Sequence, residues 1–243
     1  RSSDLCDIKV DYYKYCGLED GTYFWMGTDY LGRDLWVRMW RGARVSLAIA
    51  FISVICNVFI GIVYGSIAGY YGGKIDMVMM RITEIIGAFP EIVVVTLFIL
   101  FFGTGMLSII LCLVVQNWIG TARMIRSQFY RYKGSEYVLA ARTLGVKDMA
   151  LIFRHILPNA MSSSLSQLPF MLTANITALT ALDFLGYGLP PDAASLGELL
   201  LQGKNNLNAP WLALSGFFTL AIVLSLLIYI GEAARDAFDP RQH

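Results

Sequence analysis

Long runs without a charged residue constrain this chain more than any other feature. The last of them, Trp211 to Ile230, holds 20 residues and would form a helix of about 30 Å, which matches the hydrocarbon core of a membrane. Only 15% of the 243 residues are charged, against about a quarter in an ordinary soluble domain. We therefore expect an all-α membrane protein, and the net charge of +1 gives no support to a nucleic-acid partner.

Two more uncharged runs predict two more spans. Val45 to Tyr71 lies between flanking basic residues, and Ile156 to Leu182 is uncharged but rich in serine, glutamine and asparagine. Polar side chains of that kind normally face protein or water rather than lipid. We expect the second of these runs to cross the membrane inside the bundle.

The longest uncharged run predicts a pair of spans. Ile92 to Ala122 holds 31 residues, which is too long for one crossing. Gly103-Thr104-Gly105 offers a turn between two helices. The first helix must begin before Ile92 to be long enough, and the second is predicted from Met106 to about Gly120, which brings the total to five spans.

Basic residues predict the orientation, because cytoplasmic loops collect lysine and arginine. Seven of the 19 basic residues lie between Thr121 and His155, so this loop is placed in the cytoplasm. Residues 1–44 and the loop 183–208 then lie outside, and 45–243 form the transmembrane domain. The basic, aromatic stretch 25–44 predicts a helix at the outer membrane surface. An external start before five spans also predicts a preceding span that this sequence lacks.

The cytoplasmic loop contains a pattern for two short helices. Ser135 can cap a helix that starts with Glu136, and Gly145 can take the left-handed conformation that ends it. A second short helix is predicted from Lys147 to Pro158, where the next span begins. The two helices would form a compact knob, on which the small residues Ala140 and Ala141 would let another protein come close. The alternative is a solvated amphipathic linker.

The order of residues in this loop resembles the EAA loop of ABC importer permeases. The matching residues run from Glu136 through Ala140-Ala141 and Gly145 to Ile156-Leu157-Pro158. The resemblance implies that the loop, residues 121–157, is the coupling element that docks into an ATPase subunit. It implies coupling roles for Glu136, Ala140, Ala141, Arg142, Gly145 and Pro158.

Further stretches are similar to the C-type permeases of dipeptide and oligopeptide importers. They include Gly27-Thr28-Asp29, Gly72-Gly73-Lys74-Ile75-Asp76, Ala88-Phe89-Pro90, Phe184-Leu185-Gly186-Tyr187-Gly188 and Arg235-Asp236-Ala237-Phe238-Asp239-Pro240-Arg241. Two stretches depart from the family pattern, at Ala194-Ser195-Leu196-Gly197 and at Leu227 to Glu232. Both concern the outer loop or the last helix, so they bear on substrate or docking details.

The resemblance implies a type I ABC importer transmembrane domain in the bacterial cytoplasmic membrane, surrounded by lipid. Its expected partners are a second homologous permease, two ATP-binding subunits, a substrate-binding protein and a peptide substrate. The chain itself is expected to be non-catalytic and to bind no cofactor, with ATP and Mg²⁺ held by the ATPase subunits. In keeping with this, the sequence has no phosphate-binding glycine loop. The alternatives are a nickel importer of the same branch and a self-sufficient secondary transporter or channel.

Polar groups within the spans are candidates for a pathway or gate. Pro90 should kink its helix, and Glu91 beside it needs a wet or paired environment. Asn117, Gln167 and Asn175 either bond between helices or line a path. Arg81 and Glu84 stand three residues apart, so the plainer interpretation is a structural pair on one helix face.

The remaining chemistry-bearing residues are sparse. Cys6 and Cys16 lie in the external segment, where a disulfide or two free thiols are both open. The two histidines, His155 and His243, stand apart from the four cysteines, and no metal site is predicted. A membrane-embedded enzyme is disfavoured because the sequence shows no catalytic histidine, cysteine or metal cluster.

Overall fold

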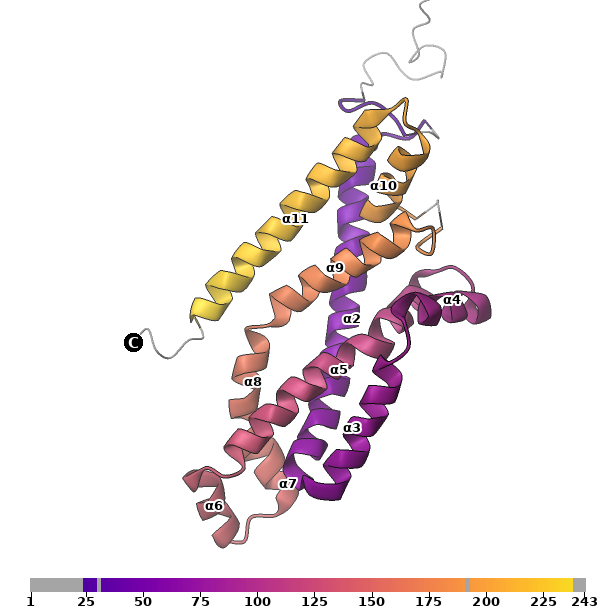
Figure 1. Ribbon diagram of the computed structural model, residues 1–243. Coiled ribbons are helices and arrows are strands. Elements are labelled where there is room, and N and C mark those ends of the chain that lie inside the picture. Colours follow the sequence, from indigo (N-terminus) through magenta and orange to yellow (C-terminus); the bar gives the residue numbers. More distant parts are fainter. Residues whose placement is uncertain (1–23, 30–31, 191–192, 238–243) are drawn as a thin grey trace, which may run out of the picture.

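The computed structural model describes residues 24–29, 32–190 and 193–237, and in these ranges the chain is helical with no strand (Figure 1). A single bridge joins Thr28 to Asp34. The helices are α2 (Leu35–Tyr71), α3 (Gly73–Gly87), α4 (Glu91–Phe102), α5 (Met106–Tyr132), α6 (Glu136–Thr143), α7 (Asp148–Ala150), the π-helix η1 (Leu151–Ile156), α8 (Leu157–Leu165), α9 (Leu168–Phe184), α10 (Leu196–Asn205) and α11 (Pro210–Ala237). The predicted all-α fold is confirmed.

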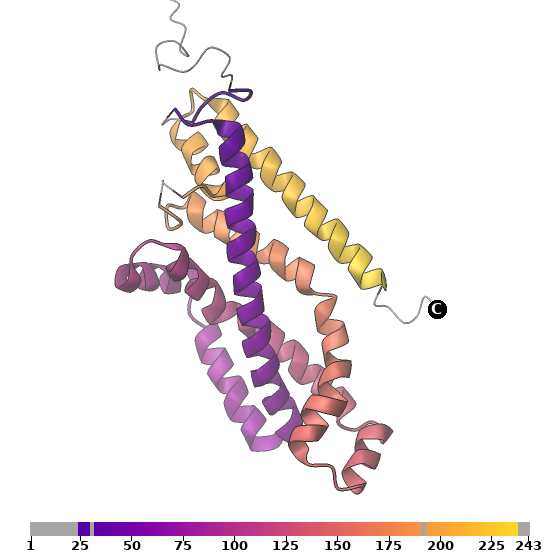
Figure 2. The ribbon, with the colours of Figure 1, turned by 180° about the vertical axis from the view of Figure 1, so that it is seen from behind.

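Helix α2 connects the two ends of the molecule. Its 37 residues span about 55 Å at the rise of an α-helix, from the end that carries α10 to the end that carries α6 (Figures 1 and 2). These are called the α10 end and the α6 end below. Asp34 caps the start of α2 by accepting a hydrogen bond from the Trp36 amide at 2.9 Å. Residues 35–44 belong to this one helix, so the separate surface helix expected over 25–44 is wrong.

A stripe of glycines lets α2 approach α5 closely. Gly61, Gly65 and Gly69 recur every fourth residue, which places them on one face of the helix. A Cβ atom at Gly61 or Gly69 would lie 2.5 Å from the side chain of Thr121 or Phe129. Close backbone approach through small residues is a usual way to join membrane helices. The α2–α5 interface is the largest between two helices in the described chain.

The predicted kink at Pro90 is confirmed. Helices α3 and α4 meet there at an angle of 77° and together form one broken or re-entrant span. Pro90 has no amide hydrogen to donate to the Ile86 carbonyl four residues earlier, and the side-chain amide of Gln116 on α5 supplies a donor there. It donates to the carbonyls of Phe89 at 2.7 Å and Ile86 at 3.2 Å.

The run from Ile156 to Leu182 does not form the single span that was expected. It is divided into α8 and α9 by Ser166 and Gln167. Pro169 stands in the first turn of α9, and a proline there supplies no amide hydrogen to a preceding turn. By length and composition, α2, α5 and α11 can each cross a membrane, and the bent α3–α4 pair can count as a fourth span.

Helix α5 is longer than predicted. It continues from the expected end near Gly120 to Tyr132, and so carries Arg123, Arg126 and Arg131 on a helix rather than in a loop. The extension runs toward the α6 end (Figure 1), where Arg126 contacts Asp76 near the start of α3.

Candidate functional site

The predicted knob is present at the α6 end. Helix α6 ends at Thr143, and Gly145, two residues further on, has a φ of +80°. The amide of Gly145 donates to the carbonyl of Arg142 at 3.0 Å, and that of Val146 to the carbonyl of Ala141 at 3.2 Å. This pair of hydrogen bonds is the glycine-dependent C-terminal cap of a helix. The sequence therefore predicted both the helix and its stop.

The chain stays helical after the knob, so the expected stop at Pro158 is wrong. It runs without a break from Asp148 through η1 to Leu165. A proline inside a helix clashes with the carbonyl four residues earlier, here that of Arg154. The wider π-helical turns of η1 directly before Pro158 relieve that clash. The expected side-chain cap at Ser135 is also wrong, because its hydroxyl donates to the Tyr132 carbonyl at 2.6 Å instead.

The inner face of the knob is part of the protein core. Val138 and Ala141 of α6 and Ile156 of η1 pack with Phe129 of α5 and Tyr70 of α2, all of them buried. Ala141 is only 8% exposed, so the idea that it faces a partner is wrong. Ala140 is exposed on the same helix. The knob is thus packed against α2 and α5, the two helices that share the largest interface in the described chain.

The exposed part of the knob, called its outer face here, carries several large apolar side chains. Leu144 is 84% exposed, and Tyr137, Leu139, Met149 and Phe153 are exposed as well. Glu136 and Gly145 are exposed beside them. Exposed apolar side chains at the tip of a protein are candidates for a contact surface.

A polar contact that the sequence did not predict fixes the knob to the end of α2. Arg142 donates to the hydroxyl of Tyr70 at 3.1 Å, and its guanidinium lies 5.7 Å from the centre of the Tyr70 ring. The same hydroxyl donates to a carboxylate oxygen of Asp148 at 2.5 Å. Arg142, predicted as a coupling residue, therefore acts inside the chain by joining α6 to α2.

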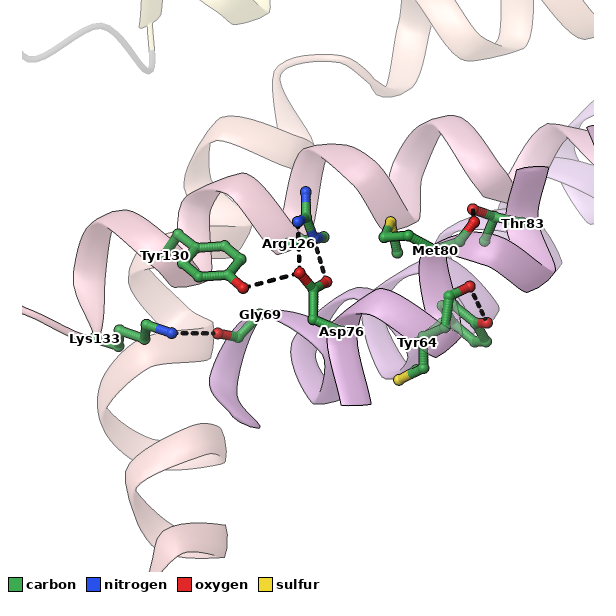
Figure 3. Close-up of polar contacts among 9 residues, drawn as sticks. Tyr64, Gly69, Asp76, Met80, Thr83, Arg126, Tyr130 and Lys133 are labelled. Carbon is green, nitrogen blue, oxygen red and sulfur yellow. Dashed lines mark hydrogen bonds and ion pairs between the residues drawn. The ribbon is translucent and has the colours of Figure 1, made fainter. Parts of the chain in front are cut away.

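A second set of polar contacts joins the α2–α3 turn to α5 (Figure 3). The carboxylate of Asp76 accepts two hydrogen bonds from the Arg126 guanidinium and one from the Tyr130 hydroxyl, the latter at 2.9 Å. Lys133 donates to the carbonyl of Gly69 at 3.1 Å. These partners are 50 or more residues apart in the chain, so a sequence pattern does not reveal them.

The predicted pathway residues lie at three places in the structure. Asn117 on α5 donates to Asn175 on α9 at 3.2 Å, which confirms a bond between helices. Gln167 lies at the α8–α9 break and is partly buried. Pro90 and Glu91 lie exposed at the α3–α4 break.

A hollow of about 430 Å³ lies beside the α3–α4 break, lined in part by Glu84, Gln116 and Arg123. Arg81 and Glu84 form an exposed ion pair at 2.7 Å, which confirms the plainer interpretation of these two residues. The lining of this hollow is mixed, because Gly87, Ala88, Ile119 and Gly120 complete it. It contains none of Asn117, Gln167 or Asn175.

The cysteines offer no site. Cys56 and Cys112 are free thiols on α2 and α5, while Cys6 and Cys16 lie outside the described residues. Across the described ranges no group of three or more histidine, cysteine, aspartate or glutamate side chains could hold a metal ion.

Fold and site together define a helical membrane protein with a knob at one end that carries exposed apolar side chains. Residues 61–243 match the family described as the binding-protein-dependent transport system inner membrane component, and the chain belongs to this family. The family resides in the inner membrane, in agreement with the predicted location.

Two relatives are similar over nearly the whole chain. The peptidoglycan transport system permease protein YejE of Agrobacterium fabrum is 45% identical over 91% of this chain and 58% of its own length. The inner membrane ABC transporter permease protein YejE of Escherichia coli is 44% identical over 90% of this chain and 64% of its own length. The chain therefore spans less than two thirds of these two relatives.

A third relative and a solved structure extend the comparison. The oligopeptide transport system permease protein OppC of Bacillus subtilis is 38% identical over 89% of this chain and 72% of its own length. A chain of the MetNI methionine ABC transporter, solved in inward-facing conformations, superposes with a TM-score of 0.71 at 19% identity, over 84% of this chain and 97% of that one. This likeness shows the fold, that of an ABC importer transmembrane subunit.

Proposed function

We propose that this chain is the permease subunit of a bacterial ABC importer that carries peptides across the cytoplasmic membrane by alternating access. The observation that carries the proposal is the knob at the α6 end, with its inner face in the core and its outer face exposed and apolar. The names of the relatives, which refer to peptidoglycan, oligopeptide and dipeptide transport, support a peptide cargo.

The α6 end faces the cytoplasm in this proposal, and the knob docks into one of two ATP-binding subunits. These subunits hold ATP and Mg²⁺ and perform the hydrolysis, while this chain is non-catalytic. Glu136, Ala140 and Gly145 lie on the docking surface. Ala141 and Arg142 attach the knob to α2 and α5, so that a displacement of the knob moves both helices.

The cargo path runs beside the α3–α4 break. Glu84, Gln116 and Arg123 give the hollow there three polar side chains, and the break at Pro90 and Glu91 gives the span a point at which it can bend. A second homologous permease completes the path, with lipid around the pair, and a substrate-binding protein delivers cargo at the α10 end. Asn117 and Asn175 hold α5 to α9 at the border of that path.

The docking surface can be tested with two leucines of equal exposure at opposite ends. Leu144 and Leu207 are both 84% exposed, so neither supports the fold. Leu144→Glu places a charge on the knob and should abolish co-purification with the ATP-binding subunits and ATP-driven peptide uptake. Leu207→Glu, at the α10 end, should retain co-purification with the ATP-binding subunits. If both variants lost, or both retained, co-purification with the ATP-binding subunits, the knob would not be the docking surface.

A further inference from the structure

A small polar pocket lies at the α10 end, away from the knob and from the α3–α4 break. It has a volume of about 330 Å³ and lies between the end of α9, the turn that follows it, and α10. Asp183, Glu198, Gln202 and Asn206 are among its lining residues. The first three are at most 5% exposed, so the pocket is lined by buried oxygen-bearing side chains.

The wall around Asp183 is tightly constructed. Its carboxylate accepts hydrogen bonds from the Leu189 amide at 3.0 Å and the Ser195 hydroxyl at 2.6 Å. Gly188 and Gly197 pack directly on this side chain, since a Cβ atom at either position would overlap it. The carboxylate is therefore held in one position before a ligand arrives.

Gln202 provides an acceptor that lacks a donor. Its Nε2 donates to Glu198 at 3.2 Å. A carboxylate only accepts hydrogen bonds when ionised, so this contact fixes which side of the amide carries the oxygen. That oxygen, Oε1, is buried and has no hydrogen-bond partner among the described residues. An unpaired buried acceptor costs free energy, and a donor entering from the pocket would remove that cost.

The charges around the pocket also favour a cation. Asp29, Asp183 and Glu198 are acidic and buried, and the basic groups in the same cluster are Arg33 and Arg38. The two arginines pair with Asp29 at 2.8 and 3.3 Å, and their charges also act on Glu198. Neither arginine lines the pocket, whose lining carries the carboxylates of Asp183 and Glu198 and no basic side chain. Burial raises the pKa of Glu198 above its usual value, as expected for a carboxylate without full compensation.

We infer that this pocket binds a primary ammonium group, the amino end of the peptide cargo. Three N–H donors of an ammonium match the carboxylates of Asp183 and Glu198 and the free oxygen of Gln202. The size argues against a bare metal ion, because a water molecule occupies only about 30 Å³ and the pocket has room for the first residue of a peptide. The inference rests on the proposed function for the nature of the cargo and for the outward position of the α10 end.

Binding to the assembled transporter in lipid nanodiscs, without the substrate-binding protein, tests the pocket directly. The probes are alanyl-alaninamide, which has a free ammonium, and its N-acetyl derivative, which has none. We expect the free amine to bind about tenfold or more tightly than the acetylated probe, measured by saturation-transfer NMR titration.

Glu198→Gln and Gln202→Leu should each weaken binding of the free amine about tenfold and leave the acetylated probe unaffected. Lys204→Met is the matched control on the same helix, because Lys204 lies exposed against the Phe184 ring and should leave binding unchanged. The yield of assembled transporter shows whether each variant folds.

Equal affinity for the two probes, or unaltered affinity in both pocket variants, would overturn the inference. The inference would also be overturned if the wild type bound neither probe while the pocket variants no longer docked the substrate-binding protein. The ammonium would then belong to a lysine of that protein. ATP-driven peptide uptake by the wild type is measured separately. Failure of uptake would contradict the proposed function, whereas failure of probe binding alone would contradict the pocket.

Discussion

The α6 end and the α10 end of this molecule use polar residues in different ways. At the α6 end, the Arg126 side chain of the Asp76–Arg126 pair is 32% exposed and that of Asp76 is 9% exposed, and the exposed surface of the knob carries large apolar side chains. At the α10 end, Asp183, Ser195, Glu198 and Gln202 are all buried. Helix α2 passes through both regions (Figure 2).

The difference shows how one chain can serve two kinds of contact. An exposed apolar knob that packs against α2 and α5 and is hydrogen-bonded to α2 suits a large protein partner whose movement displaces it. A buried polar network around a small pocket suits a small charged ligand, because desolvated charges interact more strongly than hydrated ones. Three substitutions test this comparison, first by breaking the link between the two ends and then by perturbing each end.

Gly65→Leu should have the largest effect on stability, because it separates α2 from α5 and so breaks the connection between the two ends. A Cβ atom at Gly65 would collide with the carbonyl of Ala122 and the side chain of Ile125. We expect a loss of about 3 kcal/mol, measured as a lower thermal unfolding midpoint of the purified protein. Gly120→Leu is the control, since a Cβ there meets nothing within 4 Å; equal losses would contradict close packing at Gly65.

Ser195→Ala should have an intermediate effect and perturb only the α10 end. The Ser195 hydroxyl donates to Asp183 and accepts from the Glu198 amide at 3.1 Å, so its removal leaves two buried groups without a partner. We expect the free energy of unfolding to fall by about 2 kcal/mol. This fall should not change with salt concentration. Ser135→Ala is the control at the start of α6, where the hydroxyl caps no amide. If Ser135→Ala lowered the free energy of unfolding as much as Ser195→Ala, the contrast between the two ends would be contradicted.

Asp76→Asn should have the smallest effect and perturb only the α6 end. It removes the charge that pairs with Arg126, and because that arginine is about one third exposed, solvent screens the pair. We expect a loss of about 1 kcal/mol at low salt that shrinks as sodium chloride is added. Unfolding midpoints at two salt concentrations provide the measurement. A loss independent of salt would mean that both ends have the same buried character.

The sequence was sufficient where a single residue determines local geometry. Gly145 ends α6 in the left-handed conformation, and Pro90 separates α3 from α4. Arg81 and Glu84 pair because they are neighbours on one helix face. Pro169 likewise indicates the α8–α9 break. The run from Ile156 to Leu182 was nevertheless expected to be one span, because it has no charged residue.

Contacts between distant segments could not be predicted from the sequence. Asp76 meets Arg126 across 50 residues because α3 and α5 pack side by side. Asp183 meets Ser195 because the turn after α9 returns the chain to the end of that helix. The burial of Ala141 depends on the same packing, and its alanine neighbour Ala140 is exposed although the two look alike in the sequence. The pocket beside α10 likewise depends on the turn after α9, whose path no periodicity specifies.

The central claim is that the knob transmits movement from the ATP-binding subunits to the membrane helices. Gly145 and Gly134 are both exposed in the same loop, and a Cβ at either position meets nothing within 4 Å, but only Gly145 has a positive φ. A β-branched residue is strained there. Gly145→Val and Gly134→Val therefore differ in backbone strain and not in crowding.

The decisive measurement is the number of peptides imported per ATP hydrolysed by the complete transporter in proteoliposomes. Gly145→Val should lower this ratio strongly, because the altered knob no longer moves with the ATP-binding subunits, while Gly134→Val should keep the wild-type ratio. Full substrate-stimulated hydrolysis and full uptake in Gly145→Val would contradict the account.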